Sequence, residues 1–327
     1  MKFSVAMCTY NGARYLSEQL ESIAAQSRPP DELVICDDRS SDETVKIVER
    51  FQEQSQFPVR LYVNEEQLGS TKNFEKAIGL CAGDVIALSD QDDVWHAEKL
   101  KLFEAVFTNE PRVGYVFTDA EVVNENLHPT GYRLWQCIEF NEAKQARMRR
   151  GRGLDLLLLS HAVTGATMAF RSRFKELILP IPEGLIMIHD AWIALVVAVA
   201  ALPALISEPL IKYRQHPHQQ LGAGLFESKA PKEEGTAQLS TSEKSPFRDQ
   251  LYPLKIIRER LDATGGRFYD RRGFAQLEAL TTHFERRARM QQSGRLNRIS
   301  PIMKELIAFR YHLYSNGVYS AAKDLLL

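Results

Sequence analysis

The chain has 327 residues, of which 44% are hydrophobic and 25% are charged, as in an ordinary soluble globular protein. Its net charge of −1 argues against a nucleic-acid-binding protein, because such proteins carry a strongly basic surface. The four cysteines lie far apart without metal-ligand spacing, so we expect free thiols and a reducing compartment.

No targeting or membrane-spanning segment is expected. The N-terminus becomes polar by Thr9, which is too early for a signal peptide. The longest apolar run, residues 191–206, contains Pro203 and is too short to span a membrane, so it is predicted to be a buried helix followed by a short strand. We therefore predict a cytoplasmic protein, and leave open a peripheral contact with the inner face of a membrane.

The first hundred residues alternate short apolar runs with amphipathic segments. Strands are expected at residues 3–8, 33–36, 59–63 and 85–88. Helices are expected between them, at residues 15–26, 44–51 and 74–81. This alternation predicts a parallel sheet with right-handed crossovers. The carboxyl ends of its strands would share one edge, where open α/β sheets bind ligands.

The second half of the chain is less regular and suggests three parts. Residues 1–225 are expected to form the catalytic domain, and the polar segment 226–246 a linker or mobile loop. Residues 247–327 are predicted to be a helical C-terminal appendage, with helices at 254–261, 274–284 and 302–314. The apolar face of the middle helix fits either packing against the catalytic domain or contact with a membrane surface.

A cluster of carboxylates follows the fourth expected strand. Asp90, Asp92 and Asp93 repel one another unless something positive neutralises them. Hard oxygen ligands suit Mg²⁺ or Mn²⁺, which usually accompany a diphosphate. A polar turn that caps the following helix is the alternative, but a cap needs only one Asp. The dinucleotide fingerprint GxGxxG and the P-loop motif are both absent.

Six short motifs in a fixed order resemble the family 2 glycosyltransferases of the GT-A fold, in particular their bacterial rhamnosyltransferase-like branch. The motifs are residues 9–12, 37–42, 90–93, 164–165, 189–192 and 213–216. The resemblance covers roughly residues 1–220 and implies a nucleotide-binding, Rossmann-like, mostly parallel sheet. Two positions depart from the family pattern: Arg39 replaces the usual Gly, and His189 precedes Asp190 where Glu is common.

The resemblance implies that the first turns hold the nucleotide. Thr9, Tyr10 and Asn11 would pack against it and bond to it, and Asp38 would accept a hydrogen bond from the pyrimidine N–H. Asp90 would orient the ribose or a metal-bound water. As an alternative, Asp38 caps the helix that follows the second strand.

The remaining motifs imply the reacting groups. Asp92 and His216 would bind the metal, and Arg214 would approach the diphosphate. Asp190 would act as the general base, because a free hydroxyl is a poor nucleophile. Two alternatives stay open: Asp190 as a helix N-cap, and His216 as a buried structural imidazole.

The implied function is an inverting, metal-dependent glycosyltransferase. It would move a sugar from a UDP- or dTDP-linked donor to a hydroxyl of a glycan or lipid-linked acceptor, in bacterial cell-surface polysaccharide synthesis. A nucleotidyltransferase of related fold is an alternative, although residues 9–14 lack its Gly-rich loop with Arg and Lys. A non-catalytic sugar-nucleotide-binding protein is another.

Overall fold

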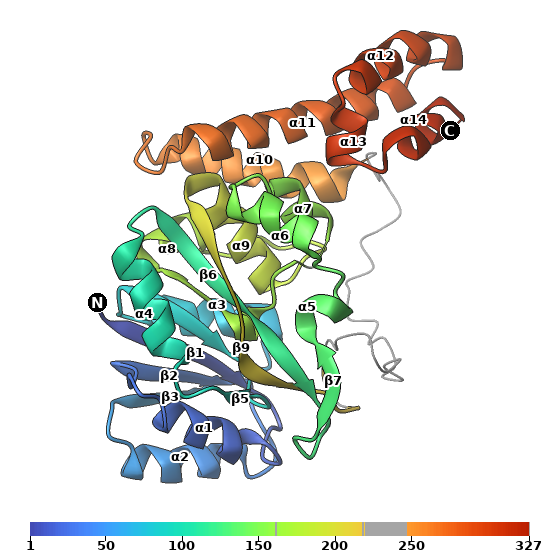
Figure 1. Cartoon of the computed structure of the whole chain (residues 1–327). Coiled ribbons are helices and arrows are strands. Elements are labelled where there is room, and N and C mark those ends of the chain that lie inside the picture. Colours follow the sequence, from blue (N-terminus) through green and yellow to red (C-terminus); the bar gives the residue numbers. More distant parts are fainter. Residues whose placement is uncertain (161, 218, 220–246, 327) are drawn as a thin grey trace.

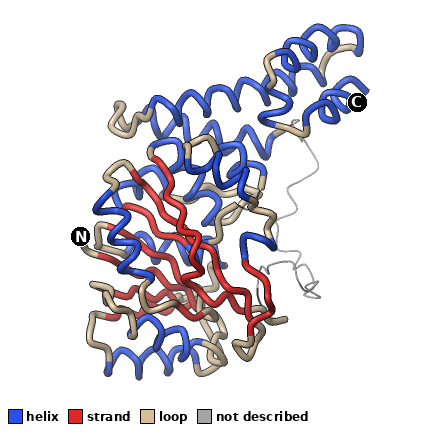
Figure 2. The backbone as a smooth tube through the Cα atoms, in the orientation of Figure 1, coloured by secondary structure: helices blue, strands red, loops and turns tan. Residues whose placement is uncertain are grey.

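The computed structural model describes residues 1–160, 162–217, 219 and 247–326. A twisted central sheet has helices on both faces, and a second group of helices crosses one end of this α/β part (Figure 1). The strands run through the middle of the molecule, while the C-terminal third is helical (Figure 2). The predicted linker, residues 226–246, lies outside the described residues.

Nine strands in the described part form one sheet with the order β3-β2-β1-β4-β8-β6-β9-β5, and β7 pairs with β6. The pairs among β3, β2, β1 and β4 are parallel, as predicted, and so is the long β6–β9 pair. Antiparallel pairing of β8 with β4 and β6 joins these two parallel parts. The strands are β1 (Phe3–Thr9), β2 (Glu32–Asp37), β3 (Val59–Val63), β4 (Val85–Ser89), β5 (Val94–Trp95), β6 (Val113–Val123), β7 (Pro129–Arg133), β8 (Met168–Arg171) and β9 (Leu202–Arg214).

The two faces of the sheet are covered by different helices. Alternate residues of β2 illustrate the division, because Leu33 and Ile35 face one hydrophobic cluster and Val34 and Cys36 face the other. The first cluster lies under α1 (Leu16–Ala24), α2 (Thr44–Gln54) and α4 (Lys99–Asn109). The second lies under α3 (Ser70–Leu80) and α9 (His189–Ala200). Shorter helices connect these elements: α5 (Leu134–Cys137), α6 (Glu142–Arg149), α7 (Leu154–Leu159) and α8 (Lys175–Ile178).

The apolar run at residues 191–206 forms a helix and the start of a strand, as predicted. The strand is longer than expected, because β9 continues without a break to Arg214. It is long because it pairs with β6 over most of its length. This pairing carries the 213–216 motif to the edge of the sheet where β4 and β5 place the acidic motif.

The C-terminal helices fall into two groups. α10 (Arg248–Ala263) and α11 (Arg271–Gln291) share the hydrophobic cluster of α9, and Leu277, Leu280 and Phe284 are buried in it. The apolar face of α11 therefore packs against the protein, which decides between the two alternatives for that face. α12 (Arg295–Ile307), α13 (Arg310–Tyr314) and α14 (Gly317–Leu326) have a small cluster of their own.

Two further expectations can be compared with these helices. The predicted helix 302–314 is interrupted, because Phe309 has a φ of 55° and lies between α12 and α13. None of the helices in the described ranges has the length and apolar character needed to cross a bilayer.

Cys36 and Cys81 are buried free thiols, and Cys8 is half-buried.

Candidate active site

The turns that follow β1 and β2 are bound to each other. The Thr9 hydroxyl donates to Asp37 Oδ2 across 2.7 Å. The Asn11 side-chain oxygen accepts from the Ser41 backbone N–H at 2.8 Å, and the Asn11 backbone N–H donates to the Ser40 hydroxyl. Asn11 and Arg39 both have positive φ, of 44° and 65°. Glycine adopts this left-handed conformation without strain, which agrees with the Gly that the resemblance leads us to expect at the position of Arg39.

Asp38 lies at the end of β2 and is almost fully buried. It does not cap α2; its carboxylate instead fixes the loop before α3. Oδ1 accepts from Leu68 N and Asn64 Nδ2, and Oδ2 accepts from Gly69 N, all within 2.8 Å. A carboxylate offers about four acceptor positions, so one position on Oδ2 is left for a ligand N–H.

Gln91 joins the acidic loop to the first turn, a role that sequence reasoning missed. Its Oε1 accepts from Tyr10 N at 2.9 Å, and its Nε2 donates to Tyr10 O at 3.0 Å. The side chain thus pairs with the main chain as a neighbouring strand would, and it leaves the Tyr10 ring exposed. A Cβ on Gly12 would lie 2.1 Å from Gln91 Oε1, which explains the glycine in this turn.

The four carboxylates of the acidic and 189–192 motifs share one electrostatic environment. Burial and the neighbouring Asp92 and Asp190 raise the pKa of Asp90 to about 7. Burial and the charges of Asp92 and Asp90 raise the pKa of Asp93 well above its usual value. One oxygen of Asp93, Oδ2, is buried without a protein partner. Burial and the charges of all four carboxylates raise the pKa of Tyr213 on β9.

Arg214 and His216 bring the end of β9 to the acidic loop. The Arg214 guanidinium donates from Nε to Asp92 O at 2.6 Å, and from its other nitrogens to Glu125 O and the Glu18 carboxylate. The same group lies over the Tyr15 ring. These bonds use three of the five guanidinium N–H groups, so Nη1 and Nη2 each have one further N–H that could contact a diphosphate.

His216 lies beside Asp92, as the metal hypothesis requires. Its Nε2 is 2.8 Å from Asp92 Oδ2, and its ring lies 4.8 Å from the Tyr15 ring, centroid to centroid. His216 is therefore one of a pair of potential metal ligands on two different elements.

Asp190 lies in the first turn of α9, where Ile188 is the N-cap residue. The N-cap alternative is therefore not what the structure shows. Oδ2 of Asp190 accepts from Gly165 N at 2.8 Å, and Oδ1 accepts from Ala191 N. The preceding His189 stacks on Phe74 with ring centroids 4.0 Å apart, and its Nδ1 is buried without a partner. Burial lowers the pKa of His189, which favours the neutral ring.

Lys99, at the start of α4, is a second residue that sequence reasoning missed. Its side chain is fully buried; Nζ donates to Ala166 O at 2.7 Å and lies 3.6 Å from the centroid of the Trp95 ring. Burial lowers the pKa of Lys99 well below its usual value, whereas Asp93 and Asp90 act in the opposite direction. The sequence signal was a lysine six residues after the acidic motif, in a segment that looked like an ordinary amphipathic helix.

The donor set fits a hard divalent cation. The available ligand atoms are carboxylate oxygens and one imidazole nitrogen. In addition, Asp93 Oδ2 is a buried acceptor without a protein partner, and a positive group would satisfy it. In the described ranges no three His, Cys, Asp or Glu side chains already converge as a metal site. Asp92 and His216 would thus supply protein ligands, and the remaining positions would fall to water and diphosphate oxygens.

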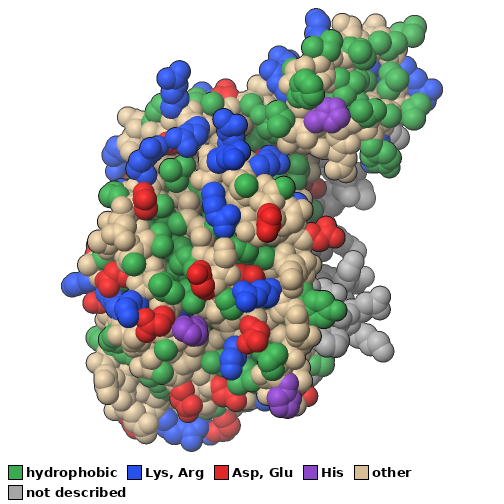
Figure 3. Space-filling model, viewed as in Figure 1, with side chains coloured by type: hydrophobic (Ala, Val, Ile, Leu, Met, Phe, Trp, Pro, Cys, Tyr) green, Lys and Arg blue, Asp and Glu red, His purple; other side chains and the backbone are tan. Residues whose placement is uncertain are grey.

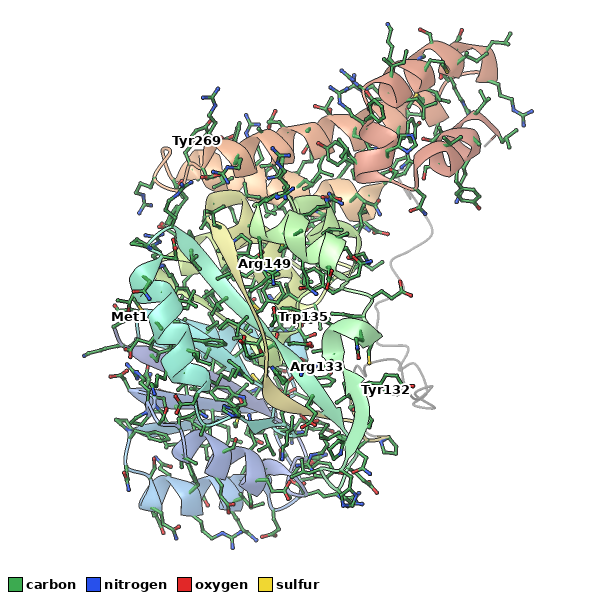
Figure 4. The ribbon with its side chains drawn as sticks, viewed as in Figure 1. Met1, Tyr132, Arg133, Trp135, Arg149 and Tyr269 are labelled. Carbon is green, nitrogen blue, oxygen red and sulfur yellow. The ribbon has the colours of Figure 1, made fainter. Side chains whose placement is uncertain are left out.

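An open cavity of about 590 Å³ lies away from these residues, beside β5, β7 and β9. Tyr132 and Arg133 belong to its lining and come from β7 (Figure 4). None of the predicted site residues lines it. The functional assignment therefore follows the carboxylates and not this cavity.

The fold is similar to that of TarS from Staphylococcus aureus. The structure of TarS 1–349 in complex with UDP superposes with a TM-score of 0.56 at 20% identity, covering 88% of this chain and 71% of that one. At this level of identity the likeness establishes the fold, which is the α/β GT-A fold with a helical C-terminal part.

Residues 4–177, just over half of the chain, match the family model described as Glycosyl transferase family 2, and the chain belongs to that family. It is 29% identical over 139 residues to the Escherichia coli UDP-Glc:alpha-D-GlcNAc-diphosphoundecaprenol beta-1,3-glucosyltransferase WfgD, covering 42% of this chain and 53% of WfgD. It is 37% identical over 99 residues to the Shigella flexneri dTDP-rhamnosyl transferase RfbG, covering 29% of this chain and 34% of RfbG. The chain thus spans about half or less of the length of these relatives.

Proposed function

We propose that this protein is an inverting, metal-dependent glycosyltransferase that uses a UDP- or dTDP-linked sugar. The relatives named above act on UDP-glucose and dTDP-rhamnose, and this supports a nucleoside-diphosphate sugar as the donor. The observation that carries the proposal is that Asp92–His216 and Asp93–Arg214 contacts hold the acidic loop against the end of β9, with Asp190 near enough for its charge to act on Asp90 and Tyr213. A strand-end acidic loop facing a separate carboxylate provides one group for the leaving diphosphate and another for the attacking hydroxyl.

Asp190 would be the general base. Its carboxylate is buried and oriented by Gly165 N, so it can accept the proton of an acceptor hydroxyl without first losing a shell of water. A single base that delivers a hydroxyl opposite the leaving group inverts the anomeric centre. The diphosphate is a good leaving group, so the site needs no general acid of the kind that glycosidases use.

The nucleotide would lie over the ends of β1 and β2. Thr9, Tyr10 and Asn11 form the first turn, and Asp38 has one acceptor position on Oδ2 for a pyrimidine N–H. The exposed Tyr10 ring can stack on the base. Asp90 would lie near the ribose, because it directly follows β4, which pairs with β1 and so ends beside the first turn.

Asp92 and His216 would hold Mg²⁺ or Mn²⁺, which supplies a Lewis acid for the charge that develops on the leaving diphosphate. The other interactions at this site are made by the protein's own residues. Arg214 holds the main chain of the acidic loop through Asp92 O, and its own backbone N–H binds Asp93 Oδ1 at 3.1 Å. These contacts fix the separation between the acidic loop and the end of β9.

The acceptor would be a hydroxyl of a glycan or of a lipid-linked glycan in bacterial cell-surface polysaccharide synthesis, at the cytoplasmic side of the membrane. The name of WfgD specifies a diphosphoundecaprenol-linked acceptor, which supports this class. Residues 1–225 would be the catalytic domain, with residues 247–327 as a C-terminal part that helps to position the acceptor.

The test is a thermal-shift screen of UDP, dTDP, GDP and their sugars, with Mn²⁺ or with a chelator, followed by transfer assays on the stabilising donor. A ligand that binds only the native state raises the melting temperature, and we expect this for uridine or thymidine nucleotides with Mn²⁺. Asp262→Asn, at an exposed position on α10, is the control for the Asp190→Asn variant described below. If no nucleoside diphosphate stabilises the protein under either condition, the proposal is wrong.

The same assays separate an enzyme from a non-catalytic binding protein. An enzyme hydrolyses or transfers the sugar of the stabilising donor, and loses this activity in Asp190→Asn while still binding the nucleotide. Binding without turnover by the wild-type chain, with any of the candidate acceptors, would favour the non-catalytic alternative.

A further inference from the structure

The outer face of α12 is apolar and uncovered. Leu296, Ile299, Met303 and Ile307 follow one another at intervals of three, four and four residues, which places them on one side of the helix. Leu296 is 84% exposed and Ile307 is 73% exposed. The opposite side of α12 carries the buried residues of this helix, so the exposed row is a second apolar face and not part of the core.

The two following helices extend this surface. The C-terminal tip, which we define as residues 286–326, projects from the α/β part at the end of α11 (Figure 1). Hydrophobic side chains gather on this projecting end, with Lys and Arg at its margin (Figure 3). The exposed large apolar residues contributed by α13, α14 and their connections are Phe309, Leu313, Val318, Tyr319 and Leu326.

The accessible charge of the tip is positive. Between residues 286 and 326 the sequence has eight Lys and Arg but two acidic residues, in a chain with a net charge of −1. Both acidic residues, Glu305 and Asp324, are 1% exposed. Glu305 is bonded to Arg286 and Arg310, and Asp324 is bonded to Arg287. The exposed basic residues are Arg286, Arg289, Arg295, Lys304 and Lys323.

Buried ion pairs also hold the tip in shape. Arg287 donates to both oxygens of Asp324, and Arg298 donates to Asp324 O. His283, Glu305 and Ser315 form a second buried chain of hydrogen bonds between α11 and the later helices. The acidic residues of the tip are thus used internally, and its accessible charge is cationic.

We propose that the tip binds the surface of an anionic lipid bilayer, with α12 lying in the plane of the interface. An apolar helix face bordered by Lys and Arg is the pattern of an interfacial helix, in which apolar side chains enter the acyl region and cations contact headgroup phosphates. Exposed aromatic rings, here Phe309 and Tyr319, favour the same interface. A second copy of the chain fits less well, because two cationic tips would repel each other.

This inference concerns a surface different from the one expected from the sequence, where the apolar face of α11 was the candidate. The structure buries that face against the catalytic part, and the uncovered face belongs to α12. The proposal stands on the tip alone and does not depend on the transfer reaction.

The experiment is co-sedimentation of the full chain with vesicles of neutral phosphatidylcholine, with or without an equal amount of phosphatidylglycerol. We expect binding to the anionic vesicles that weakens as salt is raised, and at least about tenfold weaker binding to the neutral ones. The double variant Leu296→Glu/Ile307→Glu should lose about tenfold or more in affinity for anionic vesicles. Tyr132→Glu, at a position 53% exposed on β7 and away from the tip (Figure 4), is the matched control and should bind like the wild type.

Sedimentation velocity without lipid tests the competing explanation, which is self-association through this face. A wild-type dimer that the double variant converts to a monomer, with no vesicle binding by either, would assign the face to self-association and overturn the proposal. Equal vesicle binding by wild type and double variant, with both folded by circular dichroism, would also overturn it. A charge variant, Lys304→Glu/Lys323→Glu, should weaken binding to anionic vesicles and leave binding to neutral ones unchanged.

Discussion

The backbone N–H of Gly165 donates a hydrogen bond to Oδ2 of Asp190 across 2.8 Å. This bond joins two of the sequence motifs, which are separated by β8, α8 and the loop before α9. It also orients the carboxylate of Asp190. A Cβ on Gly165 would lie 3.2 Å from Asp190 Cβ and 3.5 Å from Asp190 Oδ2, so a side chain at position 165 would disturb this contact. Gly165 is therefore the partner that fixes the proposed base.

Asp190→Asn should abolish transfer and preserve nucleotide binding. The Asn side-chain oxygen can still accept from Gly165 N, but the Nδ2 that replaces Oδ1 cannot accept from Ala191 N, so the fold should persist with a loss of about 0.5–1.5 kcal/mol in stability. Asn cannot take the proton of the acceptor hydroxyl, and the loss should be about a hundredfold to ten-thousandfold in turnover. Calorimetric nucleotide affinity measured beside the transfer rate checks this. Near-normal turnover in the variant would show that Asp190 has a structural role only.

Asp92→Asn should remove metal-dependent turnover without weakening the fold. The substitution relieves repulsion within the acidic loop, so the melting temperature without ligand should be unchanged or higher. The wild type should be stabilised by Mn²⁺ with nucleotide, and Asp92→Asn should show a much smaller shift. His216→Asn is the companion variant, because Nε2 of His216 lies 2.8 Å from Asp92 Oδ2. Full wild-type rates in excess chelator would contradict the metal assignment.

The ligand-free protein should lose stability as pH rises from about 4 towards 7. Asp90 has a pKa raised to about 7 in the native state, whereas an unfolded Asp titrates near 3.9. Within this window the native state holds a proton that the unfolded chain releases, so the contribution of Asp90 to stability falls with pH and levels off above 7. Asp90→Asn should remove this dependence. The test is the melting temperature of wild type minus variant, measured with a chelator at each pH.

The sequence predicted the first four strands, their parallel pairing, and the meeting of the first three motifs at one edge of the sheet. These follow from hydrophobic periodicity and from the ends of parallel strands, which are local properties. What each site residue bonds to was not predictable. The Arg214–Glu18 ion pair and the Gln91–Tyr10 pairing join elements far apart in sequence, and such partners are set by packing of the folded chain.

The sequence also did not show which charged residues become buried. The sequence does not single out Lys99, because burial of a lysine depends on what covers it and not on its neighbours in sequence. The tip shows the same limit for apolar residues. The apolar periodicity of α11 and α12 is similar, yet the face of α11 is covered by α9 and the face of α12 is exposed. Periodicity shows that a helix has an apolar face but not what occupies it.

Lys99→Met should alter the pH dependence of catalysis. The ammonium of Lys99 lowers the pKa of Asp90, so its removal should move the acid limb of the kcat/KM profile to higher pH. Met preserves the packing of the stem, and the main structural cost is the unpaired Ala166 carbonyl, about 1–3 kcal/mol. Lys101→Met, at an exposed position on the same helix, is the control. An unmoved profile would limit Lys99 to a structural role.

Gly12→Ala should destabilise the protein and weaken nucleotide binding, because the new Cβ would lie 2.1 Å from Gln91 Oε1 and displace Gln91 from Tyr10. Overpacking of this kind costs about 1–3 kcal/mol. Gly294→Ala is the matched control, since no heavy atom lies within 4 Å of its Cβ. If the clash with Gln91 is the cause, Gly12→Ala/Gln91→Ala should be no less stable than Gln91→Ala alone, as measured by urea denaturation. Additive losses in the double variant would contradict this explanation and place the strain of Gly12→Ala elsewhere in the turn.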